Sequence, residues 1–151
     1  MSGATAIHAM VNQCRDGRLA SCVAAVESGW VVMAERQVVR GYCLLLPDPV
    51  VGHLNDLPEP ARCVFLRDMA ALGDALLAVT GALRINYAMF GNLEPALHAH
   101  AFPRYADEPA ATRTAQPWAL DWSAAPPFSA RAHDDLKMRI AAALAPVRSG
   151  R

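Results

Sequence analysis

Two histidines spaced two residues apart, His98 and His100, are the side chains best suited to chemistry near neutral pH. Successive side chains of a β-strand alternate between its faces, so these two imidazoles would project from the same face. Leu97, Ala99 and Ala101 would form the opposite face, which is small, apolar and suited to close packing against a helix. The spacing leaves two interpretations open: a chemically active pair, or a chance pair on a half-buried strand. No third His, Cys or acidic residue is spaced to complete a zinc site, so no metal site is predicted.

The sequence around this pair, INYAMFGN followed by LHAHAFPRY, resembles the active strand of the histidine triad family of nucleotide hydrolases and transferases. It is most similar to the bacterial members that resemble diadenosine polyphosphate hydrolases. The family motif alternates three histidines with apolar residues, and here Ala96 replaces the first histidine. A second match is VVRGYCLLLP at 38–47, which resembles a family strand with Tyr42 in place of its usual histidine. The resemblance covers roughly Leu19 to Tyr105.

The resemblance implies catalytic roles for both histidines. His98 would attack the α-phosphorus of a nucleotide derivative, and water or another acceptor would release the nucleotide from the resulting nucleotidyl-histidine. His100 would contact the transferred phosphate, as a hydrogen-bond donor if protonated. Asn92, before the strand, and Asn86, on the neighbouring strand, are the candidate substrate-binding amides, because they donate without adding charge. Each has an alternative: Asn92 suits a turn beside Gly91, and Asn86 suits a strand amide bonded to its neighbours.

Several positions depart from the family pattern. Ala96 offers no donor side chain, and Ala34 stands where the family has an Asn or Asp that reaches the ribose. Glu94 would repel a polyphosphate if it faced inward.

The predicted function is a nucleotide hydrolase or nucleotidyl transferase acting on dinucleoside polyphosphates or nucleoside phosphoramidates. The alternatives are a nucleotide-binding or sensing protein with little turnover, and a dimeric interaction module with a vestigial site. We expect no required cofactor, although Mg²⁺ can accompany a polyphosphate substrate. The resemblance also implies a homodimer.

Hydrophobic periodicity and turn signals predict the elements that position the histidines. Five strands are expected, at residues 21–27, 30–34, 41–47, 83–90 and 97–104. A long crossover helix is expected from Pro58 to Thr80, ended by Gly81. Gly73 within that helix indicates a close approach to the sheet, because glycine otherwise weakens a helix. The predicted fold class is α+β: an antiparallel sheet of about five strands with the crossover helix packed on it.

Helices are also expected at both ends of the chain. Apolar residues recur there at helical spacing, at Ile7, Met10, Val11 and Cys14 and again at Leu136, Ile140 and Leu144. Ser129 can cap the last helix. Between the elements, Tyr105–Pro127 is expected to be an ordered, irregular strap whose tryptophans are covered at a subunit contact. We therefore expect one histidine-triad-like domain over residues 1–151, with 106–151 as a C-terminal extension.

Composition excludes several classes of protein. With 54% hydrophobic and 19% charged residues, the 151-residue chain is globular and not intrinsically disordered. Its formal net charge is zero, so neither nucleic acid polymers nor membranes are expected partners, and a nucleotide must be bound by a local site. No apolar run reaches the roughly 20 residues that span a bilayer, and the N-terminus lacks a secretory pattern. The four cysteines form no C-x-x-C motif, which favours a cytoplasmic protein with reduced thiols.

Overall fold

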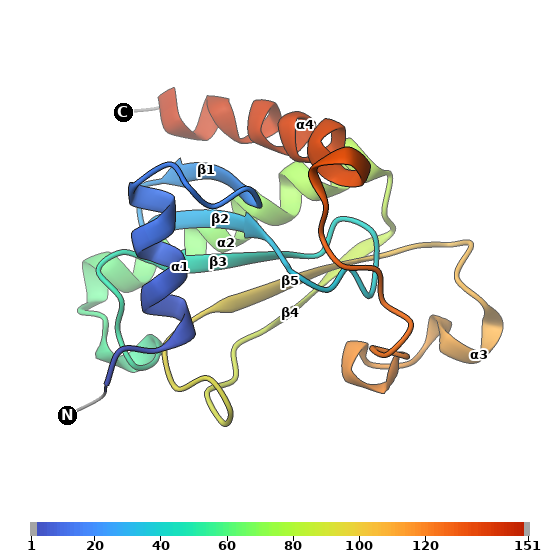
Figure 1. Ribbon diagram of the computed structural model, residues 1–151, viewed down its shortest axis with the longest axis horizontal. Coiled ribbons are helices and arrows are strands. Elements are labelled where there is room, and N and C mark those ends of the chain that lie inside the picture. Colours follow the sequence, from blue (N-terminus) through green and yellow to red (C-terminus); the bar gives the residue numbers. More distant parts are fainter. Residues whose placement is uncertain (1–2, 150–151) are drawn as a thin grey trace.

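The protein is described by a computed structural model that covers the backbone of residues 3–149 and the side chains of residues 3–145 (Figure 1). One antiparallel sheet has the strand order β1-β2-β3-β5-β4. The strands are β1 (Cys22–Val26), β2 (Gly29–Met33), β3 (Cys43–Pro47), β4 (Arg84–Ala88) and β5 (Ala99–Arg104). Each lies within a predicted strand or differs from it by one residue, and the α+β fold class is confirmed.

Helices pack on both faces of the sheet (Figure 1). The main core lies between one face and the helices α2 (Glu59–Thr80) and α4 (Ala130–Ser149). Helix α1 (Ala6–Arg15) packs on the other face against Val32 and Leu46. A short 3-10 turn, η1 (Leu54–Asp56), lies in the crossover between β3 and α2. Among residues 3–149, no helix has the length and apolar character needed to cross a membrane.

The crossover helix α2 approaches the sheet closely at Gly73. A Cβ atom at this position would lie 1.7 Å from the hydroxyl oxygen of Tyr87 on β4, so a larger residue would force the Tyr87 side chain to move. Phe65, Leu72 and Leu76 of the same helix are fully buried in the core. Gly81 ends the helix in the left-handed conformation, with φ 70°. The expected close approach and helix end are both confirmed.

The last helix also contributes to the core. Leu136, Ile140 and Leu144 of α4 are buried, as predicted, and the Ser129 hydroxyl accepts a hydrogen bond from the backbone N–H of Ala132. The C-terminal extension therefore supplies part of the packing that holds the sheet.

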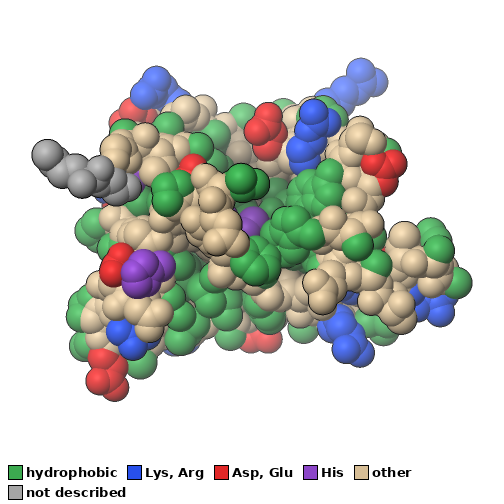
Figure 2. Space-filling model, turned by 90° about the horizontal axis from the view of Figure 1, so that it is seen from below, with side chains coloured by type: hydrophobic (Ala, Val, Ile, Leu, Met, Phe, Trp, Pro, Cys, Tyr) green, Lys and Arg blue, Asp and Glu red, His purple; other side chains and the backbone are tan. Residues whose placement is uncertain are grey.

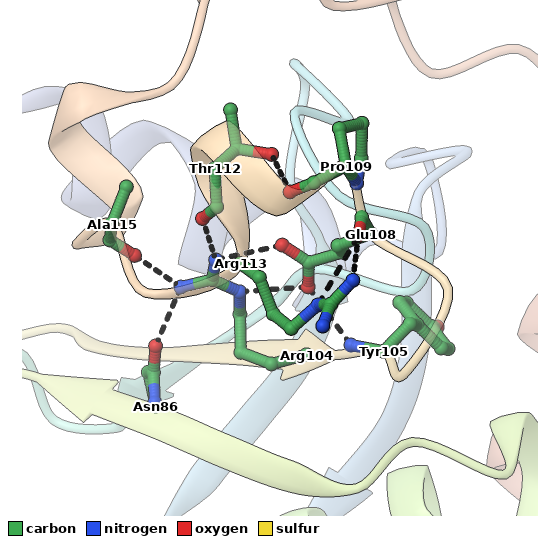
Figure 3. Close-up of polar contacts among 8 residues, drawn as sticks. All are labelled: Asn86, Arg104, Tyr105, Glu108, Pro109, Thr112, Arg113 and Ala115. Atoms are coloured by element: carbon green, nitrogen blue, oxygen red, sulfur yellow. Dashed lines mark hydrogen bonds and ion pairs between the residues drawn. The ribbon is translucent and has the colours of Figure 1, made fainter.

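The strap between β5 and α4 is irregular, as expected, with two short helical turns: α3 (Ala110–Arg113) and the 3-10 turn η2 (Pro117–Ala119). It is fastened to the sheet by Arg104, the last residue of β5 (Figure 3). The guanidinium donates to both carboxylate oxygens of Glu108, to the carbonyls of Thr112 and Ala115, and to the side chain of Asn86. The guanidinium has five N–H donors, and these five hydrogen bonds hold the strap against β4 and β5.

Candidate active site

His98 follows two buried residues, Ala96 and Leu97, just before β5. Ala96 packs in the cluster beneath α1, and Leu97 packs in the main core on the other side of the sheet. The backbone N–H of Leu97 donates to the carbonyl of Val51, and that of Ala96 donates to the Glu94 carboxylate. His98 is therefore fixed by backbone and core contacts on both sides of the strand.

One hydrogen bond determines which His98 nitrogen is free. Nδ1 lies 2.7 Å from the carbonyl oxygen of Ala96. Because a carbonyl can only accept, Nδ1 must carry a proton, and the neutral ring then has its lone pair on Nε2. The acceptor belongs to the backbone, so this contact does not depend on the side chain at position 96.

His100 lies beside His98, with ring centroids 4.8 Å apart, so the predicted sharing of one face is confirmed. Its Nδ1 is 2.6 Å from the hydroxyl of Tyr42, which is almost completely buried. If the hydroxyl donates to Nδ1, its buried proton has an acceptor and His100 carries its own proton on Nε2.

His100 is neutral near pH 7. Burial, and to a lesser extent the neighbouring His98, lowers the pKa of His100 to about 4. The protonated form of His100, which was expected to donate, is therefore not the form present near pH 7 in the free protein. The neutral ring can still donate through Nε2–H when the Tyr42 hydroxyl donates to its Nδ1.

Both histidines line a cleft of about 410 Å³, which we call the histidine cleft. Its wall residues are Phe90, Asn92, Leu93, Glu94, His98, His100, Gln116 and Trp118. In the space-filling view from below, a histidine side chain is visible near the middle of this face, flanked by hydrophobic side chains (Figure 2). His98 has only 8% of its surface exposed but is open to the cleft rather than sealed in the core.

The predicted substrate-binding amides lie in different places. Asn92 is exposed in the loop before β5 and lines the histidine cleft. Asn86 does not line it: its amide oxygen accepts a hydrogen bond from Arg104, 3.0 Å away. The carboxylate of Glu94 accepts from the backbone N–H groups of Ala6 and Ala96. Its charge is thereby placed near the N-terminal end of α1, where the helix dipole favours it.

The strap supplies cleft walls that the sequence did not predict. Trp118 meets the ring of His100 edge-on at 5.1 Å and packs against Phe90 at 4.8 Å. Trp122 packs edge-on against Tyr42. The tryptophans are thus partly covered by their own chain, where a subunit contact had been expected, although Trp118 retains 45% exposure.

Comparison with known proteins identifies the fold. No model of a protein family matches the sequence, and it matches no curated protein. Solved structures do match. A histidine triad protein from Bradyrhizobium japonicum has a TM-score of 0.69 at 19% identity, over 91% of this chain and 96% of that one. One from Marinobacter aquaeolei VT8 has a TM-score of 0.65 at 20% identity, over 97% of both chains. The chain has the histidine triad fold.

A third similar structure is the hypothetical histidine triad nucleotide-binding protein from Sulfolobus tokodaii strain 7. Its TM-score is 0.72 at 12% identity, with 92% of this chain and 93% of that chain covered. All three alignments extend beyond Tyr105, so the histidine triad fold includes much of the C-terminal region.

Within this histidine triad fold, the end of β2 is closed. Ala34, which stands where the resemblance places a ribose-binding residue, is 3% exposed and packs with Tyr42 and Phe102. Leu120 and Trp122 of the strap cover this cluster. The neighbouring Glu35 is exposed, and its backbone carbonyl accepts from the N–H of Phe128. The strap therefore occupies the space above Ala34.

Proposed function

We propose that this protein is a nucleotide hydrolase or nucleotidyl transferase that cleaves at the α-phosphate of its substrate. The observation that carries the proposal is the contact between His98 Nδ1 and the Ala96 carbonyl. This contact leaves the lone pair of Nε2 for a substrate in a cleft that also contains His100. An imidazole nucleophile with a fixed tautomer beside a second donor suits phosphoryl-group chemistry.

The proposed reaction has two displacements. In the first, Nε2 of His98 bonds to the α-phosphorus, and the bond from phosphorus to the leaving group breaks with its electron pair. A strongly basic leaving group, such as an amine, takes a proton from water as this bond breaks, and the proton released in the second step neutralises the resulting hydroxide. In the second, water attacks the phosphorus, the N–P bond breaks and the water's proton is released. A different acceptor in place of water makes the same protein a transferase.

The backbone and His100 support these steps electrostatically. The ring of His98 becomes positively charged when Nε2 bonds to phosphorus, and the Ala96 carbonyl accepts from its Nδ1–H at 2.7 Å. His100, neutral and protonated on Nε2, donates to an equatorial phosphoryl oxygen. Asn92 lines the same cleft and would donate a second hydrogen bond. Fixed donors of this kind stabilise charge as it develops in the transition state.

The proposed substrates are dinucleoside polyphosphates and nucleoside phosphoramidates, small molecules and not nucleic acid polymers. The proposed steps use protein groups and water, and we expect no metal to be required. Mg²⁺ would enter only with a polyphosphate substrate.

A homodimer is also proposed. Strand β4 is at the edge of the sheet; Tyr87 within it is 42% exposed, and Leu83 and Phe90 beside its two ends are 63% and 53% exposed. An open edge with exposed apolar side chains favours pairing with a second copy. Such pairing adds strands in the plane of the sheet and leaves the histidine face open. Sedimentation showing a monomer at micromolar concentration would contradict it.

Steady-state hydrolysis of a nucleoside phosphoramidate and of a dinucleoside polyphosphate tests the activity. We expect His98→Ala to lower kcat by at least about 10³-fold while the protein stays folded. His53→Ala, at an exposed histidine outside the cleft, is the matched control. Full activity in His98→Ala would refute the mechanism. Saturable nucleotide binding without turnover by the wild type would favour the binding or sensing alternative, and no binding at all would favour the interaction module.

A further inference from the structure

A second and larger hollow adjoins the histidine cleft. It has a volume of about 790 Å³ and lies between the β4–β5 end of the sheet and the strap, so we call it the strap hollow. Phe90, Gln116 and Trp118 line both spaces. A volume near 800 Å³ falls in the range of small-molecule sites, and the shared walls make the two spaces neighbours.

The floor of the strap hollow continues the face that bears His100. Along β5, His100, Phe102 and Arg104 share this face, and β4 places Ala88, Asn86 and Arg84 directly opposite them. Phe102, Arg104, Asn86 and Arg84 are floor residues of the hollow. From His100 to Arg104 the strand rises about 13 Å, so a ligand extending from the histidines can reach the Arg84–Arg104 row.

The side chains of the strap hollow favour a ligand that is both aromatic and negatively charged. Arginines at 84, 104 and 113 line it, whereas no Asp or Glu does. Arg104 is paired with Glu108, and Arg84 forms no ion pair within residues 3–145. Arg113 donates hydrogen bonds to the backbone carbonyl of Glu108, and its positive charge contributes, less than Arg104 does, to lowering the pKa of the Glu108 carboxyl. The shared wall made by Phe90 and Trp118 provides faces for an aromatic ring.

The arginines of the strap hollow suit only one of the two halves of a substrate, the half that carries additional negative charge. The transferred half, a nucleoside monophosphate, carries no phosphate beyond the one that His98 attacks. Further negative charge can therefore come only from the leaving group.

We propose that the strap hollow binds a leaving group that itself carries phosphate and an aromatic base, with Arg84 and Arg113 as its cationic contacts. This assignment rests on the proposed function. When the bond from the α-phosphorus to the bridging oxygen breaks, the electron pair and an added negative charge pass to the terminal phosphate of the departing nucleotide. Cations placed beyond the histidines stabilise that charge, and a small neutral amine leaving group gains nothing from them.

Two substrates with the same transferred nucleotide test this proposal. One is a dinucleoside tetraphosphate, and the other is a nucleoside phosphoramidate with a small neutral amine. The measured quantity is the ratio of kcat/KM for the tetraphosphate to kcat/KM for the phosphoramidate. Arg84→Ala and Arg113→Ala should each lower this ratio by about 10-fold, and the charge reversal Arg84→Glu should lower it further. Arg131→Ala, which removes an exposed charge from α4, is the control and should leave the ratio unchanged.

An unchanged ratio in the Arg84 and Arg113 variants would overturn the proposal, because the loss must be specific to the charged leaving group. Calorimetry on the His98→Ala variant measures tetraphosphate binding without turnover, so it separates failure of the hollow proposal from failure of the proposed function. Suppose that the wild type turns over neither substrate, but adding Arg84→Glu to His98→Ala weakens tetraphosphate binding at least 10-fold. The hollow is then supported and the catalytic mechanism fails. If the tetraphosphate does not bind, the hollow proposal fails.

Discussion

The substitution Tyr42→Phe examines how His100 is prepared to donate. It removes one oxygen and keeps the ring that packs against Phe102 and Trp122. The lost contact is the 2.6 Å hydrogen bond to Nδ1 of His100. Without it, nothing fixes the proton on Nε2, the nitrogen proposed to face the phosphoryl oxygen.

The expected loss in kcat for Tyr42→Phe follows from the strength of the lost hydrogen bond. A typical intramolecular hydrogen bond contributes about 1 kcal/mol, which corresponds to roughly a fivefold loss in kcat. His100→Ala removes the donor altogether and should cost on the order of 10²-fold. Because Tyr42 acts through His100, the two losses should not add: Tyr42→Phe should have no further effect in the His100→Ala background.

The assay is kcat for a nucleoside phosphoramidate, together with the His100 tautomer from ¹⁵N chemical shifts. Tyr105→Phe is the matched control, since its hydroxyl makes a 2.6 Å hydrogen bond to the Arg40 carbonyl and none to a histidine. Both variants should lose similar stability, but only Tyr42→Phe should lose rate and shift the His100 proton toward Nδ1. Equal rates in the two variants, or additive losses with His100→Ala, would refute the reasoning.

Three other outcomes are expected. Gly73→Ala should lower the free energy of unfolding by about 1–3 kcal/mol, because the added Cβ would clash with the Tyr87 hydroxyl. Urea denaturation measures this free energy. The double variant Gly73→Ala/Tyr87→Phe should recover part of the lost stability. The free energy of unfolding should fall as pH drops from 6.5 toward 4, because the unfolded chain protonates His100 at a higher pH than the folded chain does. The variant His100→Gln should weaken this pH dependence. A pH profile that is the same in the variant and the wild type would contradict the burial of a neutral ring. Phosphoramidate turnover should survive EDTA, and its abolition would show that a metal takes part.

Much of the fold could be predicted because its signals are local. The alternation around His98 and His100 places Leu97, Ala99 and Ala101 in the core, where the structure has them. Gly73 predicted a close approach, although its partner Tyr87 is known only from the structure.

The strap and the protonation of His100 could not be predicted in the same way. Trp118 contacts His100 from a segment without periodicity, so no sequence pattern pairs them. The low pKa of His100 depends on how deeply the folded chain buries its ring. Likewise, the acceptor for His98 Nδ1 is a backbone carbonyl, which any residue at position 96 supplies.

Trapping the covalent intermediate tests the central claim most directly. The wild type is mixed with a nucleoside phosphoramidate, quenched in alkaline denaturant within one turnover and digested for mass spectrometry. We predict that the peptide containing His98 gains the mass of the nucleoside monophosphate less water, that His53→Ala gives the same adduct and that His98→Ala gives none. Turnover with no adduct on His98, or an adduct on a different residue, would contradict the account.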